Sequence, residues 1–326
     1  MSAICLKKNQ PTLTATEGNA GNIVSEIRNI PSDQILLENS EYLVVHAKAH
    51  QIPNGLYEIG RLREISFRQA GEGTGRQVDL DRFDLFYTHI LLWNKEKHEI
   101  VGAYRIGRVD EILNRFGQQG LYTNTLFRFK PGFYHQITQA LELGRSFVRI
   151  EYQKKYSSLF LLWKGIGHFV AMHPYYRILF GPVTISNNYS MLSRELIVAF
   201  LKKYHFTKEF AGLVRTKTPI TLKTVRKSDV RALSDFSRDM EDLSNLISCI
   251  EHDRKGIPVL LKQYIHLGGK ILGFNIDRGF SNGLDGLIMV DLTECNAKLL
   301  GHYMGEKGVE KYLAYHRNAA SFDMAS

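Results

Sequence analysis

The order of an extended run, a polar turn and an apolar helix constrains the fold of this chain most. The segment ELGRSFVRIEYQKKYSSLFLLWKGIGHFV (142–170) begins with charges spaced along a strand-like run, continues through a basic turn rich in hydroxyl groups, and ends as an apolar helix. A strand that leads directly into a helix is typical of a sheet covered by helices. The segment therefore predicts an α/β protein and raises the question of what the basic turn holds.

Neighbouring segments predict the same class. The periodicity predicts a helix over 23–40, a strand at 42–45, and an amphipathic helix over 55–70 that the glycine-rich GEGTG ends. Two apolar runs around the polar turn NKEKHE predict an antiparallel hairpin over 86–109. A strand over 177–186 and a helix over 190–206 follow. This order predicts a mixed α/β layered fold.

The remaining third of the chain has weaker patterns. They predict a charged helical connector over 223–258, a helix over 259–268, a strand over 284–290 and a helix over 298–316. We therefore expect a flexible tail over 1–22, one domain over 23–206, and an extension over 207–326 that packs on the domain or continues it.

Composition limits the compartment and the partners. The 42 Lys and Arg residues against 33 Asp and Glu give a formal charge of +9, which favours anionic partners. No apolar stretch reaches the roughly 18 residues of a membrane span, and the three cysteines lack metal or disulfide spacing. We expect a cytoplasmic protein, with peripheral contact at the inner membrane as one option.

Several motifs together carry a family resemblance. They are EIGRLREISFR, the acidic run DLDRFD with His89 in FYTHILLW, IVGAYRIG, ELGRSFV and LFGPVTISN. As a set they resemble the GNAT superfamily of acyltransferases, in the branch of ornithine-lipid N-acyltransferases, N-acyl amino acid synthases and acyl-homoserine-lactone synthases. The resemblance runs from Glu41 to Phe206 and continues more loosely to the end. It implies a GNAT-like mixed central sheet flanked by helices, with a C-terminal α/β extension.

Within that branch the chain is similar to the GNAT-type half of bifunctional lysophospholipid acyltransferase-like proteins, some of which carry a hemolysin label. O-acylation by the other half uses an HxxxxD motif, in which the Asp orients a His base. None of the twelve histidines has an Asp five positions on. This chain therefore does not contain that activity.

The resemblance assigns the basic turn to the acyl donor. Members of the family bind the phosphate of coenzyme A or phosphopantetheine between the central strand and the next helix, usually with a Q/R-x-x-G-x-G/A motif. The matching positions that could bind a donor phosphate here are Gln153, Lys154, Lys155, Ser157 and Ser158. Both glycines are absent, which favours one phosphate and hence acyl carrier protein as donor over acyl-CoA. Alternatively, Ser157 or Ser158 only caps the helix and the lysines are solvated.

The resemblance also suggests catalytic residues. Glu142 is the expected general base or amine-orienting group, and Arg145 is its partner. Because side chains alternate along a strand, we expect these two on opposite faces. His89 is a further candidate, although a buried histidine within an apolar run is more often structural.

Other residues are assigned to the acceptor side or to a structural role. They are Arg63, Asp81, Asp84, Ser186 and Asn187. The alternatives are ordinary ion pairs for the charged residues and turn formation for Ser186 and Asn187. Three carboxylates, Asp79, Asp81 and Asp84, could bind Mg²⁺ or Ca²⁺, but amide formation requires no metal and none is expected.

The leading hypothesis is an N-acyltransferase that moves a long-chain fatty acyl group from acyl carrier protein, or acyl-CoA, to the amine of an amino acid such as ornithine or glycine. The product would be an N-acyl amino acid or lyso-aminolipid, and no cofactor would stay bound. One alternative is acyl-homoserine-lactone synthesis. Another is a non-catalytic basic binding module, although no nucleic-acid-binding motif is present.

Overall fold

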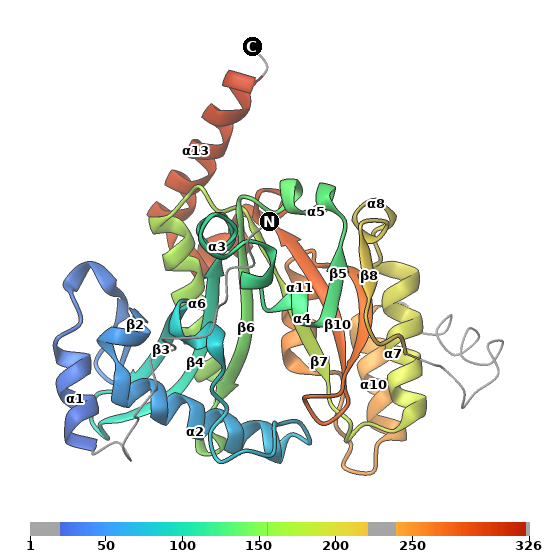
Figure 1. Ribbon diagram of the computed structural model, residues 1–326, viewed down its shortest axis with the longest axis horizontal. Coiled ribbons are helices and arrows are strands. Elements are labelled where there is room, and N and C mark those ends of the chain that lie inside the picture. The colour runs from blue at the N-terminus through green and yellow to red at the C-terminus, as the bar shows by residue number, and fades with distance from the viewer. Residues whose placement is uncertain (1–19, 155, 221–238, 324–326) are drawn as a thin grey trace, which may run out of the picture.

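A single eight-stranded sheet organises the chain in our computed structural model, which describes residues 20–154, 156–220 and 239–323 (Figure 1). Its strand order is β1 (Ile35–Glu38), β2 (Tyr42–Lys48), β3 (Thr88–Asn94), β4 (Glu99–Arg108), β6 (Ala140–Val148), β7 (Ile178–Ile185), β10 (Gly283–Asp291) and β9 (Lys270–Asp277). A second, two-stranded sheet pairs β5 (Phe127–Phe129) with β8 (Val214–Thr216). The predicted mixed α/β fold is confirmed.

Helices cover both faces of the large sheet. The described helices are α1 (Ala20–Arg28), α2 (Pro53–Gln69), α3 (Val109–Phe116), α4 (Thr123–Leu126), α5 (Pro131–Gln136), α6 (Tyr156–Met172), α7 (Met191–Tyr204), α8 (Lys208–Ala211), α10 (Met240–Ile250), α11 (Val259–His266), α12 (Ala297–Met304) and α13 (Glu306–Asp323). Most of α13 extends away from the body (Figure 1). None of the helices in the described ranges is long and apolar enough to cross a membrane.

Two helices explain why the sheet is buried on both faces. The apolar helix α6 packs Leu162, Ile166 and Phe169 into one core together with β3. On the other face, α2 buries Ile59 and Leu62 in a separate cluster with the outer faces of β2 to β4. Each such fully buried side chain contributes about 1.5–3 kcal/mol. The central strands are therefore held from both sides.

Among the described strands of the large sheet, only β6 and β7 are parallel neighbours, and they pair over a short length. Their register covers Ala140 with Ile178, Leu141 with Leu179, and Glu142 with Phe180. Beyond that point β7 continues its ladder with β10 as far as Ile185, but no further pairing with β6 is present in the described ranges. The two strands therefore separate after Glu142.

The structure differs from the sequence expectations at several elements. The predicted helix over 23–40 ends at Arg28, and Ile35–Glu38 forms β1 instead. The predicted final helix is divided at Gly305, whose φ of 73° lies in the left-handed region. The tail expected over 1–22 lies almost wholly outside the described residues, as does much of the connector over 223–258. β9 and β10 extend the large sheet, so the expected C-terminal extension supplies two of its strands.

Candidate active site

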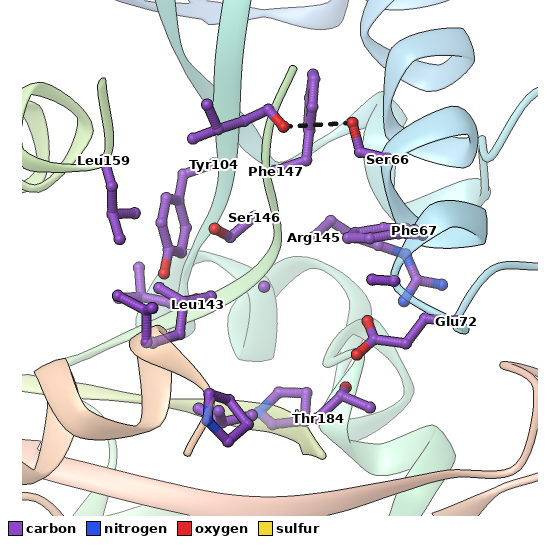
Figure 2. A pocket seen from close by; sticks show the side chains of 18 of the residues that line it. Ser66, Phe67, Glu72, Tyr104, Leu143, Arg145, Ser146, Phe147, Leu159 and Thr184 are labelled. Carbon is purple, nitrogen blue, oxygen red and sulfur yellow. Dashed lines mark hydrogen bonds between the residues drawn. The ribbon is translucent and has the colours of Figure 1, made fainter. Parts of the chain in front are cut away.

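A cavity of about 690 Å³ lies where β6 and β7 separate (Figure 2). Residues 143–148 of β6 and 182–184 of β7 line it, together with the end of α2, the loop before α6, and the start of α11. Its apolar lining includes Leu143, Leu159, Val183, Pro258, Val259 and Leu260. Its volume falls within the range of about 300–1,000 Å³ that is common for small-molecule sites.

A bulge in β6 directs Arg145 into this cavity. The pairing of β4 with β6 skips from Ala103–Phe147 to Arg105–Gly144, and Arg145 has a φ of 50°. One extra residue in a strand reverses the alternation of the side chains that follow. Glu142 and Arg145 consequently lie on the same face of the sheet, where both contact Tyr122. The expectation that they occupy opposite faces was wrong, because the alternation rule assumes an unbroken strand.

Glu142 is buried beside the cavity and does not line it. Its carboxylate accepts backbone N–H groups from Tyr122 at 3.0 Å and Thr123 at 2.7 Å, and a short hydrogen bond from the hydroxyl of Tyr87. Burial raises the pKa of Glu142, although the hydrogen bonds from Thr123 and Tyr87 oppose that shift. This geometry indicates that Glu142 fixes the segment carrying Tyr122, rather than touching an acceptor.

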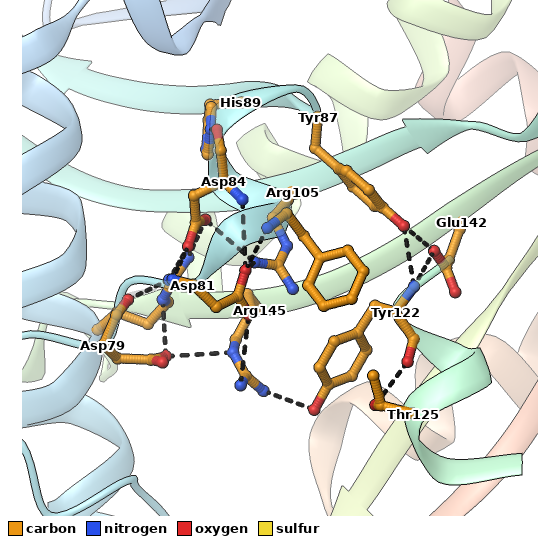
Figure 3. Close-up of polar contacts among 12 residues, drawn as sticks. Asp79, Asp81, Asp84, Tyr87, His89, Arg105, Tyr122, Thr125, Glu142 and Arg145 are labelled. Atoms are coloured by element: carbon orange, nitrogen blue, oxygen red, sulfur yellow. Dashed lines mark hydrogen bonds and ion pairs between the residues drawn. The ribbon is translucent and has the colours of Figure 1, made fainter. Parts of the chain in front are cut away.

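A largely buried cluster that includes Arg145 pairs arginines with aspartates (Figure 3). Its members are Arg63, Arg105, Arg145, Asp79, Asp81 and Asp84. Arg63 Nε lies 2.8 Å from Asp79 Oδ2, and Arg63 Nη2 lies 2.9 Å from Asp84 Oδ2. Arg105 Nη1 lies 2.6 Å from Asp81 Oδ1. Three cations therefore balance three anions.

The arginines of the cluster keep Asp84 ionised and occupy the oxygens that a metal would need. Burial tends to raise the pKa of Asp84, but Arg63 and Arg105 outweigh it and hold that pKa well below its usual range. Among the described residues no group of three or more His, Cys, Asp or Glu side chains is arranged to hold a metal ion. The acidic run thus folds around arginines from α2, β4 and β6.

His89 contacts the same cluster through the backbone of Asp84. It is fully buried in β3, and its Nε2 lies 2.8 Å from the carbonyl oxygen of Asp84, which fixes that nitrogen as the donor. Burial lowers the pKa of His89 to about 4. His89 does not line the cavity, so its position favours the structural alternative.

Ser186 and Asn187 lie outside the cavity lining as well. The Ser186 hydroxyl donates a short hydrogen bond to the carbonyl of Ala70, which joins the end of β7 to the end of α2. The Asn187 Oδ1 accepts from Arg194 Nη1 at 2.8 Å. Both side chains fix loops around the cavity.

Some of the residues predicted for the donor phosphate lie at another part of the cavity. Gln153 and Lys154 line it, and the Gln153 side chain donates to the carbonyl of Val148 at 2.9 Å. Ser157 is exposed and Ser158 is buried in the first turn of α6, where no described group bonds to the Ser158 hydroxyl. Lys155 lies outside the described residues. Two of the five predicted residues therefore line the cavity.

The sequence predicted none of the three carboxylates that line the cavity, which are Glu72, Asp277 and Asp285. Glu72 follows α2 in the glycine-rich loop, and Asp285 sits on β10 opposite Thr184 of β7, whose hydroxyl donates to it at 2.7 Å. Burial, together with the charge of Asp285, raises the pKa of Glu72 to about 8. Burial raises the pKa of Asp285 to about 7. The available signal for Asp285 was an acid inside the apolar run LDGLIMV.

Comparisons with known proteins agree with this architecture. A model of the acetyltransferase (GNAT) domain matches residues 62–164. A glycine N(alpha)-acyltransferase of Bacteroides thetaiotaomicron is 36% identical over 244 residues, which cover 70% of this chain and 69% of that protein. A glycine N(alpha)-acyltransferase of Phocaeicola vulgatus is 31% identical over 271 residues, which cover 78% of this chain and 81% of that protein.

Among solved structures, the AHL synthase LasI aligns over 82% of this chain and 96% of its own, with 11% identity and a TM-score of 0.41. The CoA-dependent acyl-homoserine lactone synthase MesI aligns over 80% and 95%, with 10% identity and a TM-score of 0.39. Scores at this level carry no argument about activity.

Proposed function

The chain belongs to the GNAT family of N-acyltransferases, and we propose that it transfers a long-chain fatty acyl group from a phosphopantetheine thioester to the amine of an amino acid. Glycine is the first candidate acceptor, because both curated relatives are named for it. Ornithine is the second. The preferred donor is acyl carrier protein, with acyl-CoA as the alternative.

The separation of β6 and β7 is the observation that carries this proposal. Backbone groups on that edge of β6 have no strand partner in the described ranges, so they are available to an extended ligand. A pantetheine arm is such a ligand, since it carries amide groups along a narrow chain. It can lie between the two strands and bring its thioester to the middle of the cavity, where an N–H of β6 would polarise the carbonyl.

The phosphate and the fatty chain of the donor also have suitable places in the cavity. Lys154 and Gln153 lie at the cavity beside the start of α6, where a phosphate gains from the lysine charge and from the positive end of the helix. The fatty chain can occupy the apolar lining between Leu159 and the start of α11. The formal charge of +9 favours an acidic carrier protein as donor, because binding a small thioester would not require so large a positive charge.

One reaction mixture tests the function. The purified chain is incubated with acyl carrier protein carrying a palmitoyl group and with a mixture of amino acids, and the lipid products are identified by mass spectrometry. A parallel mixture contains palmitoyl-CoA instead, and a third omits the chain. We expect a single N-acyl amino acid, formed faster from the carrier protein. No amide from either donor would overturn the proposal.

A further inference from the structure

We propose that the acidic end of the cavity is the acceptor subsite, in which Glu72 and Asp285 bind the ammonium group of an α-amino acid and Arg145 binds its carboxylate. This inference rests on the proposed function and adds the residues that select the acceptor. In Figure 2, Arg145, Glu72 and Thr184 lie together at one end of the cavity, while Leu159 and Tyr104 line the other.

The first reason is the pairing of the acids. In the described ranges neither Glu72 nor Asp285 forms an ion pair, whereas Asp79 and Asp84 are held by arginine. Asp285 is only 2% exposed, and its one side-chain partner is the Thr184 hydroxyl. A buried carboxylate without a cation is costly, and Asp285 is such a group. A substrate ammonium group placed between Glu72 and Asp285 would supply the missing charge.

Protonation behaviour supports this reading. Burial raises the pKa of both groups towards neutrality, so the empty site retains protons that an arriving ammonium group can displace. Asp277 also faces the site and raises the pKa of Asp285, while Arg145 lowers the pKa of both carboxyl groups. At the acidic end, Glu72 and Asp285 can therefore hold protons when no ligand is present and bind a cation when one arrives.

The second reason is the state of Arg145. Its Nε lies 3.2 Å from Asp79 Oδ2 and its Nη2 lies 3.9 Å from Asp81 Oδ2, both longer than the closest contacts of Arg63 and Arg105. It remains 12% exposed and lines the cavity, whereas those two arginines are 1% exposed. More of its charge is therefore left for a ligand.

The step balances with these groups. The acceptor enters as an ammonium ion and gives one proton to the Glu72 and Asp285 pair. Its nitrogen then attacks the thioester carbonyl carbon, so a C–N bond forms and the C–S bond breaks. The second proton from nitrogen goes to the departing thiolate, which leaves as the thiol. The carboxylate pair returns its proton to solvent.

Acceptor analogues test the subsite in the unaltered protein. Glycinamide keeps the amine and lacks the carboxylate, so it should lose at least about tenfold in kcat/KM relative to glycine if Arg145 binds that group. Equal use of glycine and glycinamide would overturn the role of Arg145. This arm needs no substitution and therefore no assumption about folding.

Two isosteric variants test the acids. Asp285→Asn and Glu72→Gln should each raise the KM for glycine at least about tenfold, because the ammonium group loses a carboxylate partner. The KM for the acyl donor should change less than about twofold, since the donor lies elsewhere in the cavity. Glu310→Gln, the same chemical change on the exposed face of α13, should leave both constants unchanged.

The outcomes separate this inference from the proposed function. If the unaltered chain acylates no amino acid, the proposed function fails and the subsite fails with it. If it acylates glycine but both variants keep the parental KM for glycine, only the subsite is rejected. A matching rise in the KM for glycine and for the donor would also reject it, because that pattern indicates general disruption of the cavity.

Discussion

The Glu142 carboxylate accepts a hydrogen bond from the backbone N–H of Tyr122, with 3.0 Å between the nitrogen and Oε2. The same tyrosine accepts a hydrogen bond at its hydroxyl from Arg145 Nη1, at 3.1 Å. Tyr122 therefore connects the buried acid of β6 to the arginine of the cavity (Figure 3). A change at Glu142 should reach the cavity through this residue.

Substitution of Glu142 tests that connection. Glu142→Gln removes the charge that accepts two backbone N–H groups and a tyrosine hydroxyl, and it adds a buried amide donor. We expect a loss of about 1–3 kcal/mol in the free energy of unfolding, with reduced turnover. Urea titration and kcat measure the two effects. A variant that unfolds like the parent yet has lost turnover would instead assign Glu142 as the base.

The arginine and aspartate cluster offers a matched pair on one helix. Arg63→Met leaves Asp79 and Asp84 buried without that partner, so we expect a loss of about 3–5 kcal/mol in the free energy of unfolding. Arg61 pairs with Glu58 at the surface of the same helix, and Arg61→Met should cost about 0–1 kcal/mol. Equal losses in urea titration would contradict the importance of the buried cluster.

Two glycines of the cavity strands should respond differently to alanine. A Cβ at Gly181 would lie 2.0 Å from the Leu143 carbonyl oxygen, at the point where β6 and β7 separate. A Cβ at Gly144 would meet no heavy atom within 4 Å among the described residues beyond its chain neighbours. We expect Gly181→Ala to cost about 1–3 kcal/mol in stability, whereas Gly144→Ala should stay within about 0.5 kcal/mol. Thermal unfolding of both variants distinguishes them.

The cavity acids predict a pH dependence of stability. Folding raises the pKa of Glu72 from 4.5 to about 8 and that of Asp285 from 3.8 to about 7. Their stabilising contribution is therefore complete below those unfolded values and is lost as pH rises towards 8. His89 acts in the opposite sense, but its contribution falls only below its ordinary value of 6.5.

Between pH 6.5 and 8.5 we accordingly expect the Tm of the parent to decrease. The double variant Glu72→Gln/Asp285→Asn should lose most of that slope, because neither replacement titrates. Calorimetry at constant ionic strength gives both curves. Parallel curves for parent and double variant would show that these groups do not titrate in that range.

The donor end predicts a dependence on salt. Lys154→Glu should raise the KM for acylated carrier protein, because an acidic partner meets a reversed charge beside α6. The difference from the parent should shrink as salt increases. Lys298→Glu makes the same charge change at an exposed position of α12 and should leave that KM near the parental value. Equal effects of the two variants would reject a docking role for Lys154.

The sequence predicted elements where local pattern and final environment agree. The hairpin over 86–109 became β3 and β4, and the apolar helix became α6, because their periodicity matches the faces they bury. The predicted helix over 23–40 includes residues 35–38, because a four-residue strand has too few positions for its alternation to show. The pairing of that strand with β2 decided its conformation.

The site was less accessible to sequence reasoning than the fold. The ELGRSFV motif of β6 predicts Arg145 as a site residue. The bulge that directs Arg145 towards the cavity depends on pairing with β4, which the motif does not contain. Asp285 lies on β10 and Glu72 follows α2, so these distant positions meet at one cavity only through the tertiary fold. Spacing along the sequence contains no information about that meeting.

The position of β10 also has a consequence for biosynthesis. During translation β10 is synthesised long after its neighbour β7. Until then, the N–H and C=O groups on one edge of β7 lack their strand partner, and the side chains of this strand are mostly apolar. During that interval Asp285 is absent, so the proposed acceptor subsite lacks one of its two carboxylates. The synthesis of β10 therefore both pairs the open edge of β7 and supplies the second carboxylate of the proposed subsite.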